Sequence, residues 1–368
     1  MTENTTIMTG WASTDLTPSE PVSIRGQMHA RVSEGVMDPI TATALAIEAP
    51  AEDQSTKVVL VSCDLVSIPD SLRTRVRDAV KAELPELPPA SVCLNATHTH
   101  AGPAIPVEND AIRSGGGGVP QFYGVDLPVM DPVRYLDTAA ARIAETVKKA
   151  WQSRTPGKVG FGLGQAVVGY NRRVTYKTGQ SSMYGNINTP EFSHVEGYED
   201  HSVNVFCTWN NADELTGLVV NVACPAQTDE HLFRLSADYW HETREELRRR
   251  LGRNLFVLPQ CSAAGDQSPH LVGHHDRPNR RASKEDPEAR MWRLSGRSQR
   301  EEIAVRIADA VTSALPFIEK EKTADPSVEQ CIETCELPMN QLTEKDVEDA
   351  RKEAAQWREK YEAEKSEL

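Results

Sequence analysis

His98 and His100 stand two residues apart and are the residues of this sequence best suited to bind a metal ion. They follow residues 91–94, an apolar run typical of a buried strand. In extended backbone the side chains of residues i and i+2 point the same way, so both imidazoles can reach one ion. A catalytic zinc takes about three protein ligands and keeps one position open. The spacing therefore predicts a zinc site; the alternative is a pair of surface histidines.

Ser268 is the second candidate, in the segment Ala-Ala-Gly-Asp-Gln-Ser-Pro-His at residues 263–270. This segment follows a short apolar run at 255–258, and its small residues allow the backbone to approach a ligand closely. A serine hydroxyl is a potential nucleophile, and free backbone N–H groups in such a loop can stabilise an oxyanion. The alternative is an ordinary Asp-Gln-Ser-Pro turn.

Cys224 is the third candidate and ends the apolar run 218–224. A thiolate is a good zinc ligand, so Cys224 could join the two histidines. The alternative is a buried structural cysteine, which is the usual state of a single cysteine in a strand.

The elements that must position these residues alternate between strands and helices. Residues 57–63 and 91–94 have the apolar character of buried strands, and residues 71–84 between them have helical spacing. This order predicts a strand–helix–strand unit with parallel pairing. The sequence also predicts helices at 132–153, 237–251 and 296–315, and strands at 159–170, 202–208, 218–224, 255–258 and 329–337.

The predicted elements indicate an α/β fold of mixed, largely parallel sheets with flanking helices, in a single large catalytic domain. We expect this domain to cover residues 1–340. Residues 341–368 are charged and are predicted to form a C-terminal helix with solvated faces. The chain ends in a run of Glu and Lys without a helix stop signal, which indicates that the natural chain continues.

Composition excludes several classes of function. Of the 368 residues 39% are hydrophobic and 26% charged, as in ordinary globular proteins, and a net charge of -14 argues against a nucleic-acid partner. No run approaches the ~20 apolar residues of a membrane helix, and no signal peptide precedes the first strand. The seven cysteines form no CxxC pair and suit a reducing compartment. We expect a cytoplasmic protein, or a secreted or periplasmic one if a leader was removed; the oligomeric state has no signal.

Taken in order, these segments resemble the neutral/alkaline (non-lysosomal) ceramidase family, whose members are zinc-dependent amide hydrolases. The family has the stretch Thr-His-Thr-His-Ser-Gly-Pro, and residues 97–103 read Thr-His-Thr-His-Ala-Gly-Pro. The family has Gly-Asp-x-Ser-Pro-Asn around its catalytic serine, and residues 265–270 read Gly-Asp-Gln-Ser-Pro-His. Shorter matches, in the same order within the N-terminal catalytic domain, lie at 14–18, 61–64, 171–172 and 236–238.

This resemblance implies a zinc-dependent hydrolase that cleaves the amide bond of a ceramide-like N-acyl substrate. His98 and His100 would bind the zinc, and Ser268 would be the catalytic serine. The metal would polarise the carbonyl, and zinc-bound water or Ser268 would attack it. Arg172 falls where the family has an arginine near the substrate, and Gly26 matches a glycine whose backbone faces the reacting carbonyl.

The sequence departs from the family at the remaining ligands. The third family ligand is a histidine in an Ala-x-His-Pro context, where this chain has Cys224 followed by Pro225. Either Cys224 replaces that histidine, or His231, Asp238 or His241 takes its role. Two further family ligands, a glutamate and a tyrosine, come from a C-terminal region that has no counterpart here. The resemblance therefore implies either a fragment or an incomplete metal site.

Two other functions remain as alternatives. The cysteine at position 224 resembles a bacterial branch of the family, and aromatic residues make up only 6% of the chain. A polar or carbohydrate-derived amide or ester is therefore an alternative substrate for the zinc hydrolase. The other alternative is an inactive ceramidase-like binding module, which predicts sub-stoichiometric zinc in the purified protein.

Overall fold

The computed structural model of the chain describes residues 6–27, 29–50, 56–106, 128–272, 294–339 and 341–364. The chain divides into two compact units, Met1–Gln330 and Cys331–Leu368. The second unit contains the helix α7 (Glu344–Glu364), which confirms the predicted C-terminal helix; residues 365–368 lie outside the described residues. The predicted strand at 329–337 is wrong, because these residues pair with no neighbouring strand in the described structure. No helix among the described residues is long and apolar enough to cross a membrane.

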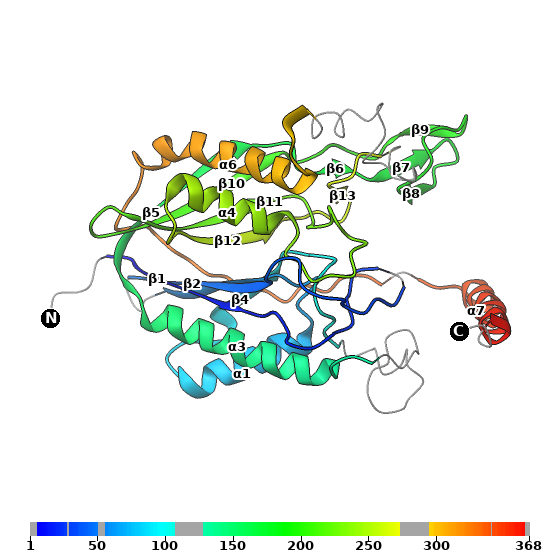
Figure 1. Cartoon of the computed structure of the whole chain (residues 1–368), viewed down its shortest axis with the longest axis horizontal. Helices are drawn as coiled ribbons and strands as arrows, with labels where there is room; N and C mark the ends of the chain where they lie inside the picture. The colour runs from blue at the N-terminus through cyan, green and yellow to red at the C-terminus, as the bar shows by residue number, and fades with distance from the viewer. Residues whose placement is uncertain are drawn as a thin grey trace. The chain divides into compact units, whose positions relative to one another are not determined.

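The first unit is built on two four-stranded sheets that pack face to face (Figure 1). The strands of one sheet are β1 (Met8–Asp15), β2 (Thr41–Ala49), β3 (Thr56–Cys63) and β4 (Val92–Ala96), in this order. The strands of the other are β5 (Thr155–Gln165), β10 (Ser202–Asn210), β11 (Leu215–Val222) and β12 (Phe256–Cys261). A short pairing of β1 with β5 at Met8 and Thr9 joins the two into one ladder of eight strands.

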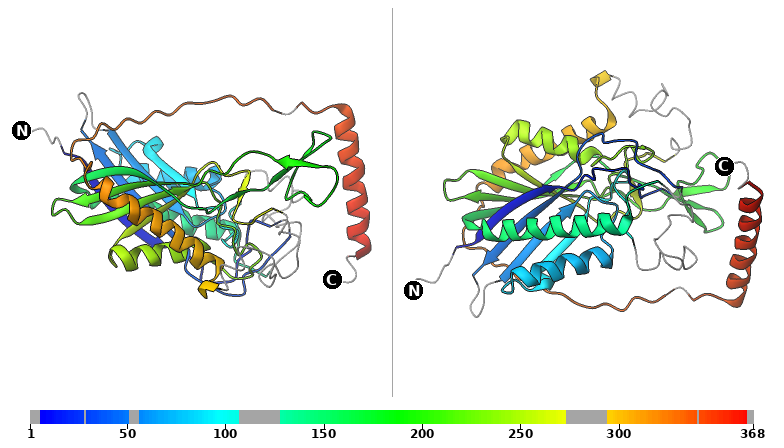
Figure 2. Two further views of the ribbon diagram at one scale, coloured as in Figure 1. Left: turned by 90° about the horizontal axis from the view of Figure 1, so that it is seen from above. Right: turned by 60° about the horizontal axis from the view of Figure 1, so that its bottom comes forward.

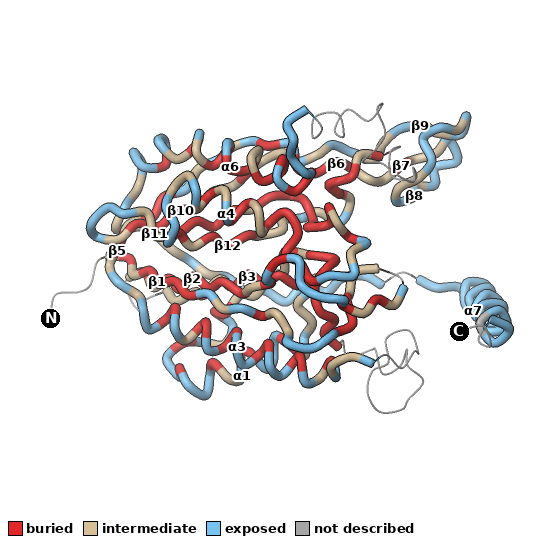
Figure 3. The backbone as a smooth tube through the Cα atoms, in the orientation of Figure 1, coloured by how far each residue is buried: buried red, intermediate tan, exposed pale blue. Residues whose placement is uncertain are grey.

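Four helices cover the outer faces and complete a four-layer sandwich (Figure 1). The helices α1 (Asp70–Glu83) and α3 (Pro132–Gln152) pack on the first sheet. The helices α4 (Tyr239–Leu251) and α6 (Gln299–Ile318) pack on the second. Figure 3 shows the resulting burial, with the strands mostly buried and the outward sides of the helices exposed. Each sheet therefore buries both of its faces, which explains the nearly continuous apolar runs in its strands.

The core between the sheets is aromatic at one end and aliphatic along its length. Trp11 of β1 and Phe256 of β12 stack with their ring centroids 5.7 Å apart. Leu45 and Leu258 are fully buried in the same layer. The two sheets share only the short β1–β5 ladder, so this packing is what mainly holds them together. Burial of each large apolar side chain contributes about 2 kcal/mol to the stability of the fold.

The mixed α/β class with flanking helices is confirmed, but parallel pairing is less extensive than the sequence indicated. Only the outer pairs of this ladder, β3–β4 and β11–β12, are parallel, and the other neighbours run antiparallel. The predicted strand–helix–strand unit is present as β3–α1–β4, and β11–α4–β12 is a second one. The neighbours β1–β2, β2–β3, β5–β10 and β10–β11 have no described helix between them along the chain, so they can pair antiparallel; β1 and β5 meet only at their short contact.

The two halves repeat one topology, although the sequence shows no internal repeat. The first half runs β1–β2–β3–α1–β4–α3, and the second runs β5–β10–β11–α4–β12–α6. Between β5 and β10 the second half adds β6 (Tyr170–Asn171) and an arm of β7 (Arg173–Tyr176), β8 (Ser181–Met183) and β9 (Phe192–Val195). Figure 2 shows this arm projecting beyond the end of the large sheets. A short strand after β12, β13 (Gln267–Ser268), pairs with β6.

A buried ion pair joins the two halves. Arg244 of α4 donates from both terminal nitrogens to the two carboxylate oxygens of Asp64, at 2.9 Å each, and Asp64 follows β3. Asp64 also accepts from the backbone N–H and the hydroxyl of Thr41. The carboxylate is fully buried, so the loss of either partner would leave an unpaired charge in the interior.

We therefore predict that Asp64→Asn destabilises the chain by about 3–5 kcal/mol, because Arg244 loses its buried counter-charge. The control is Asp213→Asn, which removes an exposed carboxylate from its ion pair with Lys158 and should cost less than about 1 kcal/mol. Urea unfolding measures both variants. Equal losses of unfolding free energy in the two variants would contradict this role of Asp64.

Candidate active site

The loops that follow β3, β4, β11 and β12 meet at one end of the sandwich. The loop after β4 and the loop after β11 are joined directly, because His100 donates its backbone N–H to the carbonyl of Ala226 and Ala226 donates to that of Thr97. The carboxyl ends of two parallel strand pairs, one from each sheet, thus form one rim. Such rims are where open α/β sheets place functional side chains.

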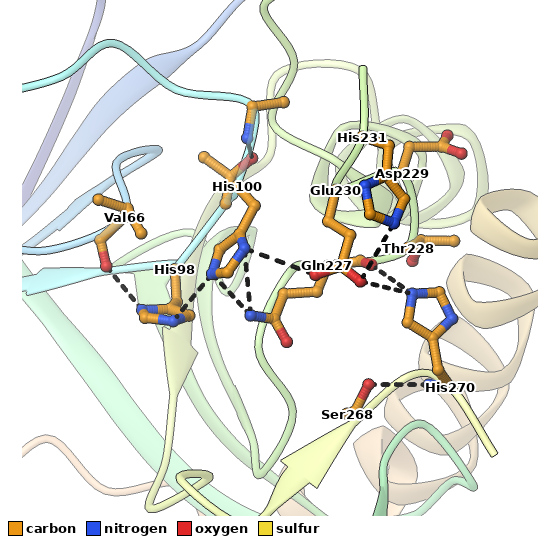
Figure 4. Close-up of polar contacts among 12 residues, drawn as sticks. Val66, His98, His100, Gln227, Thr228, Asp229, Glu230, His231, Ser268 and His270 are labelled. Carbon is orange, nitrogen blue, oxygen red and sulfur yellow. Dashed lines mark hydrogen bonds and ion pairs between the residues drawn. The ribbon is translucent and has the colours of Figure 1, made fainter. Parts of the chain in front are cut away.

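His98 and His100 direct their imidazoles toward each other, as Figure 4 shows. The two Nε2 atoms lie 3.2 Å apart, and Nδ1 of His98 lies 2.6 Å from the carbonyl oxygen of Val66. This carbonyl can only accept, so it fixes the proton on Nδ1 and leaves the Nε2 lone pair facing His100. Two ligands at zinc–nitrogen distances are separated by roughly 3.3 Å in a tetrahedral site. The pair therefore fits two ligand positions of one zinc ion.

Both imidazoles are kept neutral, which metal ligation requires. Burial lowers the pKa of His98, and burial together with the neighbouring His98 lowers the pKa of His100 to about 3. Glu230 opposes this effect weakly, since its Oε2 lies 3.6 Å from Nδ1 of His100. Val66 and Glu230 thus contact the Nδ1 atoms of the two histidines, as hydrogen-bond partners of metal-bound imidazoles commonly do.

Gly26 lies directly behind the His100 ring. Its φ is +117°, and a Cβ built on it would stand 2.5 Å from Cγ of His100 and 2.8 Å from its Cα. Only glycine leaves room for the histidine here. Gly26 thus packs against His100, and its predicted role toward a substrate carbonyl remains a prediction.

Arg31 ties together the loops that carry the site. Its guanidinium is fully buried and donates to the carbonyl oxygens of His100, Glu230, Leu232 and Arg25, at 2.6–3.0 Å. These carbonyls belong to three separate segments of the chain. One side chain thus fixes the positions of His100 and Glu230 relative to each other.

The structure does not place Cys224 with the histidine pair. Cys224 is fully buried in the core beneath α4 and α6, and its thiol contacts the carbonyl oxygens of Val168 at 3.7 Å and Pro225 at 3.5 Å. Burial raises the pKa of this thiol well above its usual value, which disfavours the thiolate. In the described structure Cys224 is the buried core residue that the sequence offered as the alternative.

The other three candidates for the third ligand also have other positions. The Asp238 carboxylate caps α4 and accepts from the backbone N–H groups of Thr228 and Tyr239. The His231 side chain is 73% exposed, and His241 lies in the first turn of α4. Among the described residues, no three His, Cys, Asp or Glu side chains lie close enough together to hold a metal. The prediction of a third ligand of these types therefore finds no support in the described part of the chain.

Gln227 occupies the position beside the histidines. Its Nε2 lies 2.6 Å from Nε2 of His100, and its Oε1 lies 3.4 Å from Nη1 of Arg172. The sequence analysis missed Gln227, because glutamine is not among the usual zinc ligands. Its place in the loop directly after β11, at the same rim as His98, is the signal that could have identified it.

Ser268 lies on β13, opposite Tyr170 of β6, and is fully buried. Its Oγ accepts a hydrogen bond of 2.9 Å from the Tyr184 hydroxyl and one of 3.1 Å from the backbone N–H of His270. Arg172 lies next to this pair, with its Nη1 3.3 Å from the Tyr184 hydroxyl. The structure thus brings together Ser268 and Arg172, which the sequence selected separately.

Tyr184 and His270 complete the connection between the serine and the histidines. Nε2 of His270 lies 2.8 Å from the carbonyl oxygen of Gln227, so the serine segment is bound to the Gln227 loop. Tyr184 comes from the arm and has a φ of +52°, a conformation that residues other than glycine adopt mainly where the surroundings impose it. The sequence analysis missed Tyr184, because it is 84 residues from Ser268 and lies outside any recognisable motif.

Comparison with solved structures confirms the fold that the sequence resemblance implied. The neutral ceramidase from Pseudomonas aeruginosa is 19% identical with a TM-score of 0.64, and a ceramidase complexed with C2 is 18% identical with a TM-score of 0.61. The match covers 85% of this chain but only 45% and 44% of those two chains, so this chain spans less than half their length. Neither a protein-family model nor a curated protein sequence matches it. The chain thus has a neutral ceramidase-like fold.

The packing of Gly26 against His100 predicts the effect of Gly26→Ala. A methyl group there must displace His100, so we expect a loss of about 1–3 kcal/mol from overpacking in addition to the cost of a positive φ. The matched control is Gly252→Ala, at a φ of +134° with no atom within 4 Å of the added Cβ. Thermal unfolding compares the two variants, and equal losses would show that the contact with His100 has no energetic effect.

The lowered pKa of His100 predicts a pH dependence of stability. The pKa of His100 in the folded chain, about 3, lies below the usual 6.5. The unfolding free energy therefore has its full value above pH 6.5 and decreases as the pH falls toward 3, because the unfolded chain binds this proton more readily. In chelator-treated protein the unfolding free energy should fall by about 2 kcal/mol between pH 7 and pH 5 because of this group. His100→Gln, which cannot titrate, should lack this part of the slope. Identical slopes in the two proteins would contradict the prediction.

Proposed function

We propose that the chain is a zinc-dependent hydrolase that cleaves the amide bond of an N-acyl substrate. The observation that carries the proposal is the convergence of two neutral imidazoles and a hydrogen-bonded serine at one rim of a ceramidase-like fold. The side chain of Gln227 contacts His100, which faces His98. The backbone carbonyl of Gln227 contacts His270, which belongs to the segment of Ser268. This arrangement supports an active site rather than a passive binding surface, because each polar group in it is oriented by a second one.

His98 and His100 are the residues that would hold the zinc. Bound there, zinc would supply a Lewis acid for the scissile carbonyl oxygen. The role of the chain is to keep both imidazoles neutral and aimed at one point. Burial maintains the neutral form, and the Val66 carbonyl fixes the tautomer of His98.

Ser268 is suited to stabilise negative charge rather than to attack. Both groups that contact its Oγ among the described residues, the Tyr184 hydroxyl and the His270 N–H, donate hydrogen bonds to it. A serine nucleophile needs a base that accepts its proton, whereas these donors polarise the Ser268 O–H toward a further acceptor. We infer that this acceptor is the oxyanion that forms on the substrate carbonyl, and that water is the nucleophile.

Arg172 strengthens this group of donors. Its guanidinium carbon lies 5.5 Å from the centre of the Tyr184 ring, and its other donors hold the carbonyl of Gly265 beside the serine segment. A fixed positive charge next to the Tyr184 hydroxyl makes that hydroxyl a better donor to Ser268. In the proposed reaction the oxygen of water bonds to the carbonyl carbon, the C–N bond breaks, and the leaving nitrogen takes up a proton.

We infer an acyl chain rather than a fully polar substrate from two exposed apolar side chains on segments that join the serine region. Met183 precedes Tyr184 in the arm and is half exposed. Tyr198 is largely exposed, and its carbonyl accepts from the side chain of Gln267, next to Ser268. Exposed apolar side chains next to a polar site give an aliphatic substrate group a surface to contact.

The proposal predicts that Ser268→Ala lowers kcat by about 10²–10³-fold with little change in KM, because the serine acts on the oxyanion rather than on the ground state. Ser182→Ala, on an exposed strand of the arm, is the control and should leave turnover unchanged. Amine release from N-acyl-sphingosines measures the activity, with acylated amino sugars as a parallel series. Removal of zinc by a chelator should abolish activity, and added zinc should restore it.

Three outcomes would contradict the proposal. Turnover of every amide at the wild-type rate in Ser268→Ala would remove the serine from the mechanism. Faster turnover of the amino sugars would replace the N-acyl lipid class with a polar one. Absence of turnover in zinc-loaded protein on both series would support the inactive binding module instead.

A further inference from the structure

We propose that Gln227 supplies the third protein ligand of the metal, through its amide oxygen, in place of Cys224. The inference rests on the proposed zinc site and assigns one of its ligands to this chain. Its starting point is the position of the Gln227 amide, whose nitrogen contacts Nε2 of His100, the atom that also faces His98 (Figure 4).

Nε2 of His100 lies close to donor groups of two other residues. Nε2 of His100 lies 3.2 Å from Nε2 of His98 and 2.6 Å from the terminal amide of Gln227. The contact between the two Nε2 atoms is a hydrogen bond through one proton when no metal is bound, and a bound cation would take the place of that proton.

The amide end of Gln227 can present either atom to this position. Its nitrogen now faces His100 and its oxygen faces Arg172, and a half-turn about the terminal torsion exchanges them. The contact to Arg172 is long, at 3.4 Å, so the turn breaks only a weak hydrogen bond. With the oxygen toward the histidines, the ligand set becomes two nitrogens and one oxygen, which suits zinc with an open fourth position.

The backbone of Gln227 is anchored so that its side chain stays at the rim. The Gln227 N–H donates to the Pro225 carbonyl, and the Gln227 carbonyl lies 2.8 Å from Nε2 of His270. The residue is 1% exposed, so the surrounding chain confines its side chain. Cys224 precedes the turn at Pro225, and its side chain belongs to the apolar core on the other side of the strand end.

This ligand set has a consequence for metal binding. An amide oxygen is neutral and binds zinc more weakly than an imidazole or a thiolate does. We therefore expect a moderate affinity, which a better ligand at the same position raises. The consequence concerns metal binding itself, so it can be measured without any substrate.

Cobalt(II) substitution tests the ligand set directly. The full chain is freed of metal with a chelator and titrated with Co²⁺, and the visible and near-ultraviolet absorption is recorded. We expect visible bands of low symmetry without the intense near-ultraviolet charge-transfer band of a cobalt-bound thiolate. Such a band in the wild-type chain would assign Cys224 as a ligand and overturn the proposal.

Three variants test the position, with zinc affinity measured by competition against a chromophoric chelator. Gln227→Leu removes the donor at similar volume and should weaken binding at least about 10-fold. Gln227→His should strengthen it at least about 10-fold, because imidazole is the better ligand. His98→Ala should abolish binding. Circular dichroism shows that each variant is folded, and Gln180→Leu on the exposed turn of the arm is the matched control.

The outcomes separate this inference from the proposed function. Unchanged zinc affinity in both Gln227→Leu and Gln227→His, with binding lost in His98→Ala, overturns the role of Gln227 and leaves the hydrolase proposal intact. Absence of metal binding by the wild-type chain overturns both. Weaker zinc binding by Gln227→Leu and stronger zinc binding by Gln227→His, without a thiolate band in the cobalt spectrum, support the assignment. This holds whether or not the substrate of the hydrolase has been identified.

Discussion

The buried guanidinium of Arg31 is the contact on which the geometry of the site depends. It donates to four backbone carbonyls, among them those of His100 and Glu230, which belong to loops far apart in the sequence. The loops after β4 and β11 also exchange backbone hydrogen bonds, but no regular ladder continues into them. A rigid, planar donor set inside the rim turns three loops into one unit. Gly26 packs directly against the His100 ring, and a side chain at position 26 would displace the histidine.

The sandwich explains why candidate site residues from both halves of the chain meet. Each half contributes one parallel strand pair with its crossover helix, and the carboxyl ends of these pairs form the rim. The first half supplies His98 and His100, and the second supplies Gln227 and Ser268. The buried pair of Asp64 and Arg244 and the core between the sheets hold the halves in register. A functional site at the junction of two similar halves needs both, so neither half could carry the proposed chemistry alone.

The histidines and Ser268 lie in two different electrostatic environments. Burial keeps the imidazoles neutral, as metal ligands must be, although the Val66 carbonyl and the Glu230 carboxylate act in the opposite direction. Around Ser268 the arrangement is the opposite, since hydrogen-bond donors and the charge of Arg172 surround a hydroxyl oxygen. The first environment favours binding of a cation, and the second favours stabilisation of an anion. A polarised carbonyl placed between them would have its charge stabilised from both sides, which is what hydrolysis of an amide requires.

The sequence by itself determined the residues whose role follows from local order along the chain. Two histidines directly after a predicted strand, a serine in a segment of small residues, and the strand–helix–strand unit around residues 57–94 are all encoded within short segments. The structure contains each of them, with His98 at a φ of +61° rather than in extended backbone. Only the tertiary structure decided which side chains join them. Whether Cys224 or Gln227 faces the histidines depends on the turn at Pro225. Tyr184 and Ser268 are 84 residues apart in the sequence, and only the fold brings them into contact. Parallel and antiparallel pairing were also decided at this level, because an apolar run records that a strand is buried but not which neighbour it pairs with.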